Sequence, residues 1–241
     1  MSRIERTSGL MRIAGTIRNY KVTRKSANFV FTDGDKTRLG VVAIAAGVAG
    51  LSGQSISAAS NVSAEEEADY VEFDLDGRQV KGWVWRSPFN EGDQVEVAAE
   101  FHEEHYEAGG IVRPSDRTIA LYPHCSRGMS GHIGNSAKWW FIGVSVLCIF
   151  FLLAGLSITG IKNFTAEFSG GLVWGVLGFY IFFGIAAISM ARKWMVFVRL
   201  AEKVFRTLDL PNPSSIDLVK SSKAQRKPDD PGEFGTFYFR Y

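Results

Sequence analysis

Two long runs without a charged residue constrain this chain more than any other feature of its sequence. They cover residues 139–160 and 168–191. A bilayer core about 30 Å thick is crossed by about 20 helical residues, so each run is long enough to span a membrane as a helix. A buried helix pair in a soluble protein would normally show shorter runs with polar interruptions. The sequence therefore predicts two transmembrane helices.

The residues beside these runs predict which side of the membrane the rest of the chain occupies. Residues 161–167 are too few for more than a tight turn, so the other ends of both helices face one compartment. The turn contains Lys162, whereas several cations flank the opposite ends and continue after Arg192. Basic flanks favour the cytoplasmic side. We therefore expect a polytopic protein of the bacterial inner membrane with both termini in the cytoplasm.

A third charge-free stretch, residues 39–64, is rich in Gly, Ala and Ser. A crossing here would export one of the basic segments, and its small residues would insert poorly. We expect this insertion to be associated with the membrane or re-entrant, with a true span as the remaining alternative. If strands before and after it pair in one domain, the insertion cannot cross the bilayer an odd number of times.

Alternating apolar residues predict a β-rich domain on both sides of this insertion. Residues 1–38 are interpreted as a basic arm with the first strands, and residues 65–137 as the remainder of the domain. Between two alternating segments lies Asp76-Gly77, a dipeptide that favours the positive φ angles of a tight hairpin turn. Short strands at such spacing are typical of a small antiparallel barrel, and we predict one that is OB-like.

The chain after the second apolar run predicts a further helix and a tail. Within residues 192–208, Val198, Ala201 and Phe205 recur at helical spacing, which indicates an amphipathic helix that packs on the barrel or lies among lipid headgroups. Residues 209–241 have the composition of a flexible tail, whose closing aromatic residues could dock as an edge strand. The predicted fold class is membrane α+β: an OB-like antiparallel β-barrel, a two-helix transmembrane hairpin and a C-terminal amphipathic helix.

The charges are unevenly distributed along the chain. Its 27 Lys and Arg nearly balance its 25 Asp and Glu, but the N-terminal arm is basic and the middle of the chain is acidic. A groove for nucleic acid needs cations clustered on one folded surface, so this distribution disfavours nucleic-acid binding. Cys125 and Cys148 are predicted to be free thiols, because Cys148 lies inside an apolar run.

The best candidate for chemistry is the segment His102-Glu103-Glu104-His105, with Glu107 nearby. Two histidines three residues apart could share a helix face and bind a metal ion. The surrounding pattern is that of strands joined by a hairpin, in which we expect the two imidazoles to point to opposite faces. We therefore interpret this segment as a solvated hairpin tip.

No other group of residues has the pattern of an active site. His124 and Cys125 are adjacent, and adjacent side chains seldom point at each other. Trp83, Trp85 and Phe89 could stack on bases, but the acidic domain around them disfavours this. The apolar runs carry no Asp, Glu, Lys, Arg or His, which disfavours ion-coupled transport. We predict no catalytic, cofactor-binding or metal-binding residue and no enzymatic activity.

Short segments in a fixed order give the chain a resemblance to a known family. They are the strand with Gly15, the charge-free insertion, the hairpin at Asp76-Gly77, FNEGDQVEV at 89–97 and IALYPHCSRG at 119–128, which leads into the apolar runs. In this order they resemble the proteobacterial inner-membrane proteins classed as type VI secretion effectors, which occur beside effector and immunity genes. The resemblance implies a role in competition between bacteria.

These expectations combine into a functional hypothesis. We expect a non-enzymatic inner-membrane protein of a type VI effector and immunity module, of the immunity type, that acts through protein contact. Its expected partners are the lipid bilayer and a toxin or secretion component, without nucleic acid, and a homo-oligomer remains open. The alternatives are the effector itself, which would disrupt membranes, and an envelope-regulatory OB-domain protein unrelated to secretion.

Overall fold

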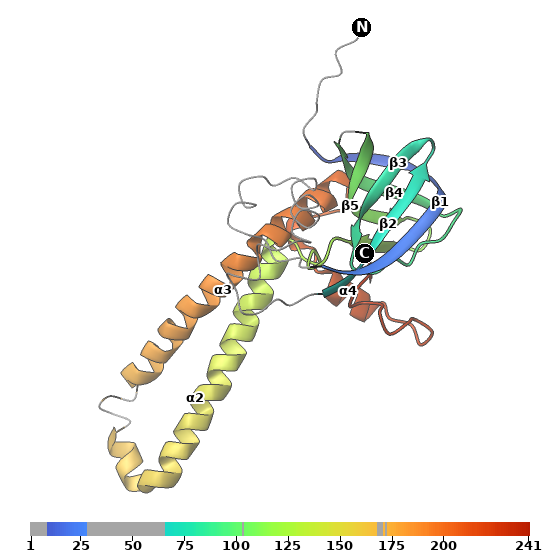
Figure 1. Ribbon diagram of the computed structural model, residues 1–241. Coiled ribbons are helices and arrows are strands. Elements are labelled where there is room, and N and C mark those ends of the chain that lie inside the picture. Colours follow the sequence, from blue (N-terminus) through green and yellow to red (C-terminus); the bar gives the residue numbers. More distant parts are fainter. Residues whose placement is uncertain (1–8, 28–65, 103, 168–170, 172) are drawn as a thin grey trace. The chain divides into compact units, whose positions relative to one another are not determined.

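The computed structural model describes residues 9–27, 66–102, 104–167, 171 and 173–241. The chain forms two compact units, of which one is Ser130–Met195 and the other contains the chain before and after it. Figure 1 shows a group of strands and two long helices. The predicted insertion at 39–64 lies outside the described residues, as does all of the chain between the first two strands, residues 28–65.

Five strands close into a barrel. The hydrogen-bonded order is β3-β2-β1-β4-β5, and a parallel pairing between β3 and β5 joins the two ends. All other neighbours in this ring are antiparallel. This order agrees with the small antiparallel barrel that the sequence predicts. The strands are β1 (Met11–Ala27), β2 (Glu66–Leu75), β3 (Arg78–Val84), β4 (Gln94–His102) and β5 (His105–Arg113). Beyond β5, β6 (Thr118–Leu121) pairs with β5, and β7 (Phe239–Arg240) pairs with β6.

Local signals explain the first hairpin of the barrel. Asp76 and Gly77, between β2 and β3, both have positive φ angles, 48° and 83°. Such angles match the twist of the flanking strands, as predicted for this dipeptide. Alternate residues of β2 point inward, so that Val71, Phe73 and Leu75 are buried in the barrel interior.

The long strand β1 pairs with two neighbouring strands. Its first part pairs with β4 and its second part with β2, and the register shifts between Arg18 and Lys21. Asn19 at this irregularity has a φ of 55°. The Glu91 carboxylate accepts hydrogen bonds from the backbone N–H groups of Asn19 (3.0 Å) and Tyr20 (2.8 Å). These bonds satisfy two donors that the bulge removes from the ladder.

A second apolar core lies on the outside of the barrel strands. The end of α3 (Val173–Thr207) supplies one side of it, and Ala201 and Phe205 of the apolar stripe predicted within 192–208 belong to this core. Arg199 and Lys203 on the opposite face are exposed. The predicted helix is therefore the last part of α3, and this part packs on the barrel. The buried helix residues are Phe197, Leu200, Ala201, Val204 and Phe205.

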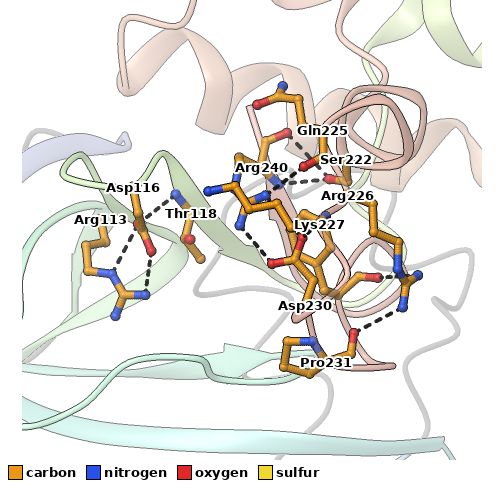
Figure 2. A network of polar contacts seen from close by, with 11 residues as sticks. Arg113, Asp116, Thr118, Ser222, Gln225, Arg226, Lys227, Asp230, Pro231 and Arg240 are labelled. Carbon is orange, nitrogen blue, oxygen red and sulfur yellow. Dashed lines mark hydrogen bonds and ion pairs between the residues drawn. The ribbon is translucent and has the colours of Figure 1, made fainter.

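The prediction of a flexible tail at 209–241 is wrong, because this segment is folded onto the barrel. Arg240 forms an ion pair with Asp230 (3.1 Å) and donates to the Gln225 carbonyl (3.0 Å), and its backbone N–H donates to the Ser222 hydroxyl (2.8 Å), as Figure 2 shows. The predicted edge strand is confirmed as β7. The tail contains η3 (Pro213–Ser215), α4 (Leu218–Ala224) and β7, and its buried apolar residues include Leu218, Phe234 and Phe239.

The other unit consists of two long apolar helices. The segments Met129–Ile158 of α2 (Met129–Glu167) and Val173–Arg192 of α3 have mean hydropathies of 2.6 and 2.0 and are long enough to cross a membrane. The prediction of a tight turn at 161–167 is wrong, because α2 continues to Glu167 after a non-helical residue at Gly160 (φ 73°).

Contacts between the two helices pair them as a hairpin. The Trp140 ring lies 5.8 Å from the Tyr180 ring, and Ser145 Oγ lies 2.6 Å from the Tyr180 hydroxyl. The Trp140 indole also lies beside Gly184, where a Cβ would be 3.5 Å from the ring, an ordinary contact distance. Most large apolar side chains of both helices are nevertheless exposed.

A substitution at Gly82 tests the parallel seam between β3 and β5. A Cβ at Gly82 would lie 2.7 Å from the Ala108 carbonyl oxygen and 2.9 Å from its Cβ. Gly82→Ala should therefore destabilise the barrel by about 1–3 kcal/mol through overpacking. Urea unfolding in detergent, followed by tryptophan fluorescence, measures the change. Gly9→Ala is the control, because no atom lies within 4 Å of its Cβ position; an equal unfolding midpoint for both variants would contradict a tight seam.

Candidate functional site

The β4–β5 hairpin brings together the residues that the sequence singled out. Its cross-strand partners are His102 with His105, Phe101 with Tyr106, and Glu100 with Glu107. Direct partners in an antiparallel ladder point to the same side of the sheet, and successive residues alternate. The two histidines and two glutamates therefore share one face, and the two aromatic residues share the other.

The prediction that the two imidazoles point to opposite faces is wrong. Along a single strand, a residue and the third residue after it point to opposite faces of the sheet. The chain itself reverses between His102 and His105, so the two become direct partners, with ring centroids 6.1 Å apart. A two-residue loop in the sequence is the signal that could have indicated this arrangement.

Strands β2 and β3 add further charges to the same face. Lys81 on β3 is the register partner of Glu107 across the parallel seam. The Lys81 ammonium also lies 3.5 Å from the carboxylate of Glu72, its partner on β2. We call Glu72, Lys81, Glu100, His102, His105 and Glu107 the outer-face cluster. Lys81, Glu72 and Glu100 had not been singled out from the sequence, because the seam that gathers them joins distant segments.

Glu107 is the most deeply buried member of the outer-face cluster, with 5% of its surface exposed. Burial raises the pKa of its carboxyl group from 4.5 to about 8, and the positive charge of Lys81 opposes this shift. Its Oε2 lies 3.4 Å from His105 Nε2. This separation is longer than an ordinary charge-assisted hydrogen bond of about 2.7–2.9 Å.

Glu100 contributes a second buried oxygen. This atom, Oε2, has no hydrogen-bond partner in the described part of the chain. The cluster thus combines three carboxyl groups, those of Glu72, Glu100 and Glu107, with the side chain of Lys81. Its side chains in their present positions do not surround one point, and no three His, Cys, Asp or Glu of the described residues form a ready-made metal site.

The other face of the hairpin presents an aromatic pair. Phe101 is 49% exposed, and its ring lies 5.0 Å from that of Tyr106. Tyr106 packs against the interior core of the barrel, so the pair has a fixed base and an exposed end. An exposed aromatic ring beside carboxylates is suited to contact with a protein that carries both apolar and basic residues.

His124 and Cys125, by contrast, are structural residues. The His124 ring packs between Trp85 (4.9 Å) and Phe197 (5.1 Å), and its Nε2 lies 2.9 Å from the Glu66 carboxylate. Burial lowers the pKa of His124 against the opposing effect of Glu66. The Cys125 thiol is buried and donates to the Phe197 carbonyl, and burial raises its pKa. A thiol held in this way is a poor nucleophile.

The aromatic residues considered for base stacking are also used in packing. Trp83 is buried beside Tyr70, with ring centroids 5.1 Å apart. Phe89 belongs to the interior core, and the Arg113 guanidinium lies over its ring. Trp85 packs against Phe237. These contacts occupy the rings that a nucleic acid would have to reach.

A shallow cavity of about 360 Å³ lies where the Asp76-Gly77 turn meets β1 and β4. Its lining includes Gly15, Asp76 and Glu96. A Cβ at Gly15 would lie 2.5 Å from Asp76 Oδ2, so a larger residue here would displace the Asp76 side chain from its place against β1. Glu96 is already paired with Arg12 at 2.8 Å. The motif residues Gly15 and Asp76 are thus explained by packing.

Comparisons with protein-family models, with curated proteins and with solved structures find no match to this chain.

The raised pKa of Glu107 predicts a pH-dependent stability. Between pH 4.5 and about 8 the folded protein retains a proton that the unfolded chain has lost, so the free energy of unfolding falls as pH rises through this window. Glu107→Gln should remove this dependence and gain stability over the wild type by pH 9, by an amount on the order of a few kcal/mol.

Thermal unfolding of the detergent-solubilised protein between pH 5 and 9, with a chelator present, measures this difference. Glu72→Gln is the matched control, because Glu72 lies on the same face but its side chain is 39% exposed. An unchanged pH profile in Glu107→Gln would show that Glu107 does not hold the extra proton.

Proposed function

We propose that this chain is an inner-membrane protein in which α2 and α3 insert into the bilayer as a hairpin and tether the barrel, which acts by contact with a protein partner. One observation carries the first part of this proposal. Only 11% of the apolar window of α2, and none of the window of α3, is buried. Core helices of soluble proteins are mostly buried, so these two helices need a different apolar environment.

The energetic argument follows from the exposed side chains. Large apolar residues on both helices are more than half exposed, among them Phe150, Ile158, Trp174 and Phe182. Each such side chain gains about 1.5–3 kcal/mol when it leaves water completely. A lipid bilayer supplies this gain along the full length of both helices, and a second copy of the chain could supply it for only part of their surface.

The distribution of cations supports a cytoplasmic barrel. Arg127 and Lys138 precede the apolar part of α2, and Arg192 and Arg199 follow that of α3, whereas Lys162 lies at the opposite end of the hairpin. Cytoplasmic flanks of membrane helices carry such an excess of Lys and Arg. Both termini are then cytoplasmic.

The contact surface that we propose is the aromatic end of the β4–β5 hairpin, with Phe101 as its anchor. Phe101 is exposed, rests on Tyr106 and is flanked along β4 by Glu100 and His102. Exposed aromatic side chains on a rigid base carry much of the binding energy of protein interfaces. The carboxylates nearby favour a partner with basic residues at its rim.

Within this class we propose the immunity role in a type VI effector and immunity module. The segments that include Gly15, Asp76-Gly77, 89–97 and 119–128 support it by their resemblance to that family. A resident membrane protein with a cytoplasmic domain stays in the cell that makes it, where it can meet an incoming toxin. An effector would instead have to leave that cell.

Reporter fusions test the membrane topology. Alkaline phosphatase fused within 162–167 should be active, and the same enzyme fused after Tyr241 should be inactive, because this enzyme folds only outside the cytoplasm. A green fluorescent protein at the two positions should give the reverse pattern. Extraction of the untagged chain from membranes by alkaline carbonate, without detergent, would contradict insertion.

A competition assay tests the functional role. A strain that lacks this gene and retains its neighbouring toxin gene should lose viability beside sibling cells, and the wild-type gene should restore it. Phe101→Ala should restore it less well, and Val22→Ala should restore it fully, because Val22 is an exposed barrel residue (45%) away from the hairpin.

Other outcomes of the same experiment separate the alternatives. Depolarisation of naive cells on expression would identify the chain as an effector. Unchanged survival of the deletion strain without depolarisation would favour an envelope-regulatory role. If Phe101→Ala restored viability as well as the wild type did, the hairpin would not be the contact surface.

A further inference from the structure

The last part of α3 carries two arginines on one face. This helix is unbroken from its apolar run to its last residue (Figure 1). Arg192 and Arg199 are both exposed and lie seven residues apart, which is about two helical turns, so they lie on the same face. Other faces of this part of α3 pack on the barrel through Phe197, Leu200 and Ala201. The barrel contact therefore leaves both guanidinium groups accessible.

Neither of these arginines is neutralised by a carboxylate. Arg192 and Arg199 form no ion pair in the part of the chain that the structure describes, and residues 168–201 contain no Asp or Glu. Arg206, about two turns farther along α3, is by contrast paired with Glu202. Two exposed and unpaired cations next to an apolar helix favour contact with anionic groups outside the chain.

The two apolar runs are staggered along the helix pair. The hydroxyl groups of Ser145 and Tyr180 lie 2.6 Å apart, so these residues are at the same level. Tyr180 lies at the middle of the run 168–191, whereas the middle of the run 139–160 lies about five residues beyond Ser145. At about 1.5 Å per residue, the second run is displaced by about 7 Å toward the C-terminal end of α3.

Both runs can be centred in one bilayer only if the helix pair is tilted. Packed helices are about 8–10 Å apart, so a stagger of about 7 Å corresponds to a tilt of about 35–40°. The seven residues from Arg192 to Arg199 then rise only about 8 Å from the bilayer. A headgroup layer is about 5–8 Å thick, and an arginine side chain reaches about 6 Å along it or back toward it. Both guanidinium groups can therefore lie in one layer of phosphate groups.

We propose that Arg192 and Arg199 bind the phosphate groups of anionic phospholipids in the cytoplasmic leaflet. This inference rests on the proposed insertion of α2 and α3. A guanidinium group can donate two parallel hydrogen bonds to phosphate oxygens, and an anionic surface attracts basic residues beside a membrane helix. Trp139 (62% exposed) and Trp194 (41%) lie near the same ends of the two helices, and exposed tryptophans are common at headgroup level.

Lipid association in vesicles tests this proposal. The full chain is reconstituted in phosphatidylcholine, and spin-labelled phosphatidylglycerol and phosphatidylcholine report how strongly each lipid associates with it. The wild type should prefer phosphatidylglycerol by about fivefold, and the preference should fall at high salt, which screens exposed charges. Arg192→Gln combined with Arg199→Gln should lower the preference to less than about half of this value. Lysine at both positions should keep most of it, because the charges remain.

The control is Arg78→Gln, which removes the same charge from an exposed residue of β3 and should behave as the wild type. Flotation with phosphatidylcholine vesicles after an alkaline wash reports insertion of each variant separately from lipid preference. Equal association of both lipids with the inserted wild type would overturn the lipid contact and leave the proposed insertion intact. An unchanged preference in the double Gln variant, or an equal loss in Arg78→Gln, would have the same consequence. A chain that did not insert would overturn both proposals.

Discussion

The parallel contact between β3 and β5 is the constraint on which the barrel depends. Its antiparallel neighbours alone would leave an open sheet with two edges. Closure presses Gly82 against Ala108 and places Lys81 beside Glu107. The interior core and the outer-face cluster therefore follow from one pairing between segments that are distant in the sequence. A pairing between such distant segments closes a long loop. The entropic cost of closing this loop must be met before the pairing stabilises the fold, so we expect it to form late in folding.

The parts of the fold that could be predicted from the sequence are those with local signals. Asp76-Gly77 adopts the turn that its residue types favour, and the alternating residues of β2 point inward as expected. The apolar stripe after residue 192 packs as one face of a helix. For this reason the sequence predicts the order of the elements, which is a barrel, two apolar helices and a helix end that packs on the barrel. Closure by β3 and β5 has no local signal, so the residues that it gathers, including Lys81, could not be identified in advance.

Two wrong predictions have related physical causes. The histidines at 102 and 105 were assigned to opposite faces by counting along one strand, whereas the chain reverses between them. The tail at 209–241 was judged by its average composition, whereas a few residues fold it: Phe234 is buried, and Arg240 reaches Asp230. Both features depend on which segments meet in space. Composition and spacing describe each segment separately and therefore do not contain this information.

The histidine face and the aromatic face of the β4–β5 hairpin are carried by the same strand ends. Phe101 and His102 are consecutive residues of β4, and Tyr106 and His105 are consecutive residues of β5. Consecutive residues of a strand point to opposite faces, so the barrel that orders one face of these strand ends also orders the other. The partner proposed for Phe101 would therefore meet a surface that is already ordered, at a lower entropic cost. The contacts described between the apolar helices are aromatic packing and a neutral hydrogen bond between Ser145 and Tyr180, which join the two helices to each other. Under the proposed function, recognition of the partner would therefore rest on the barrel.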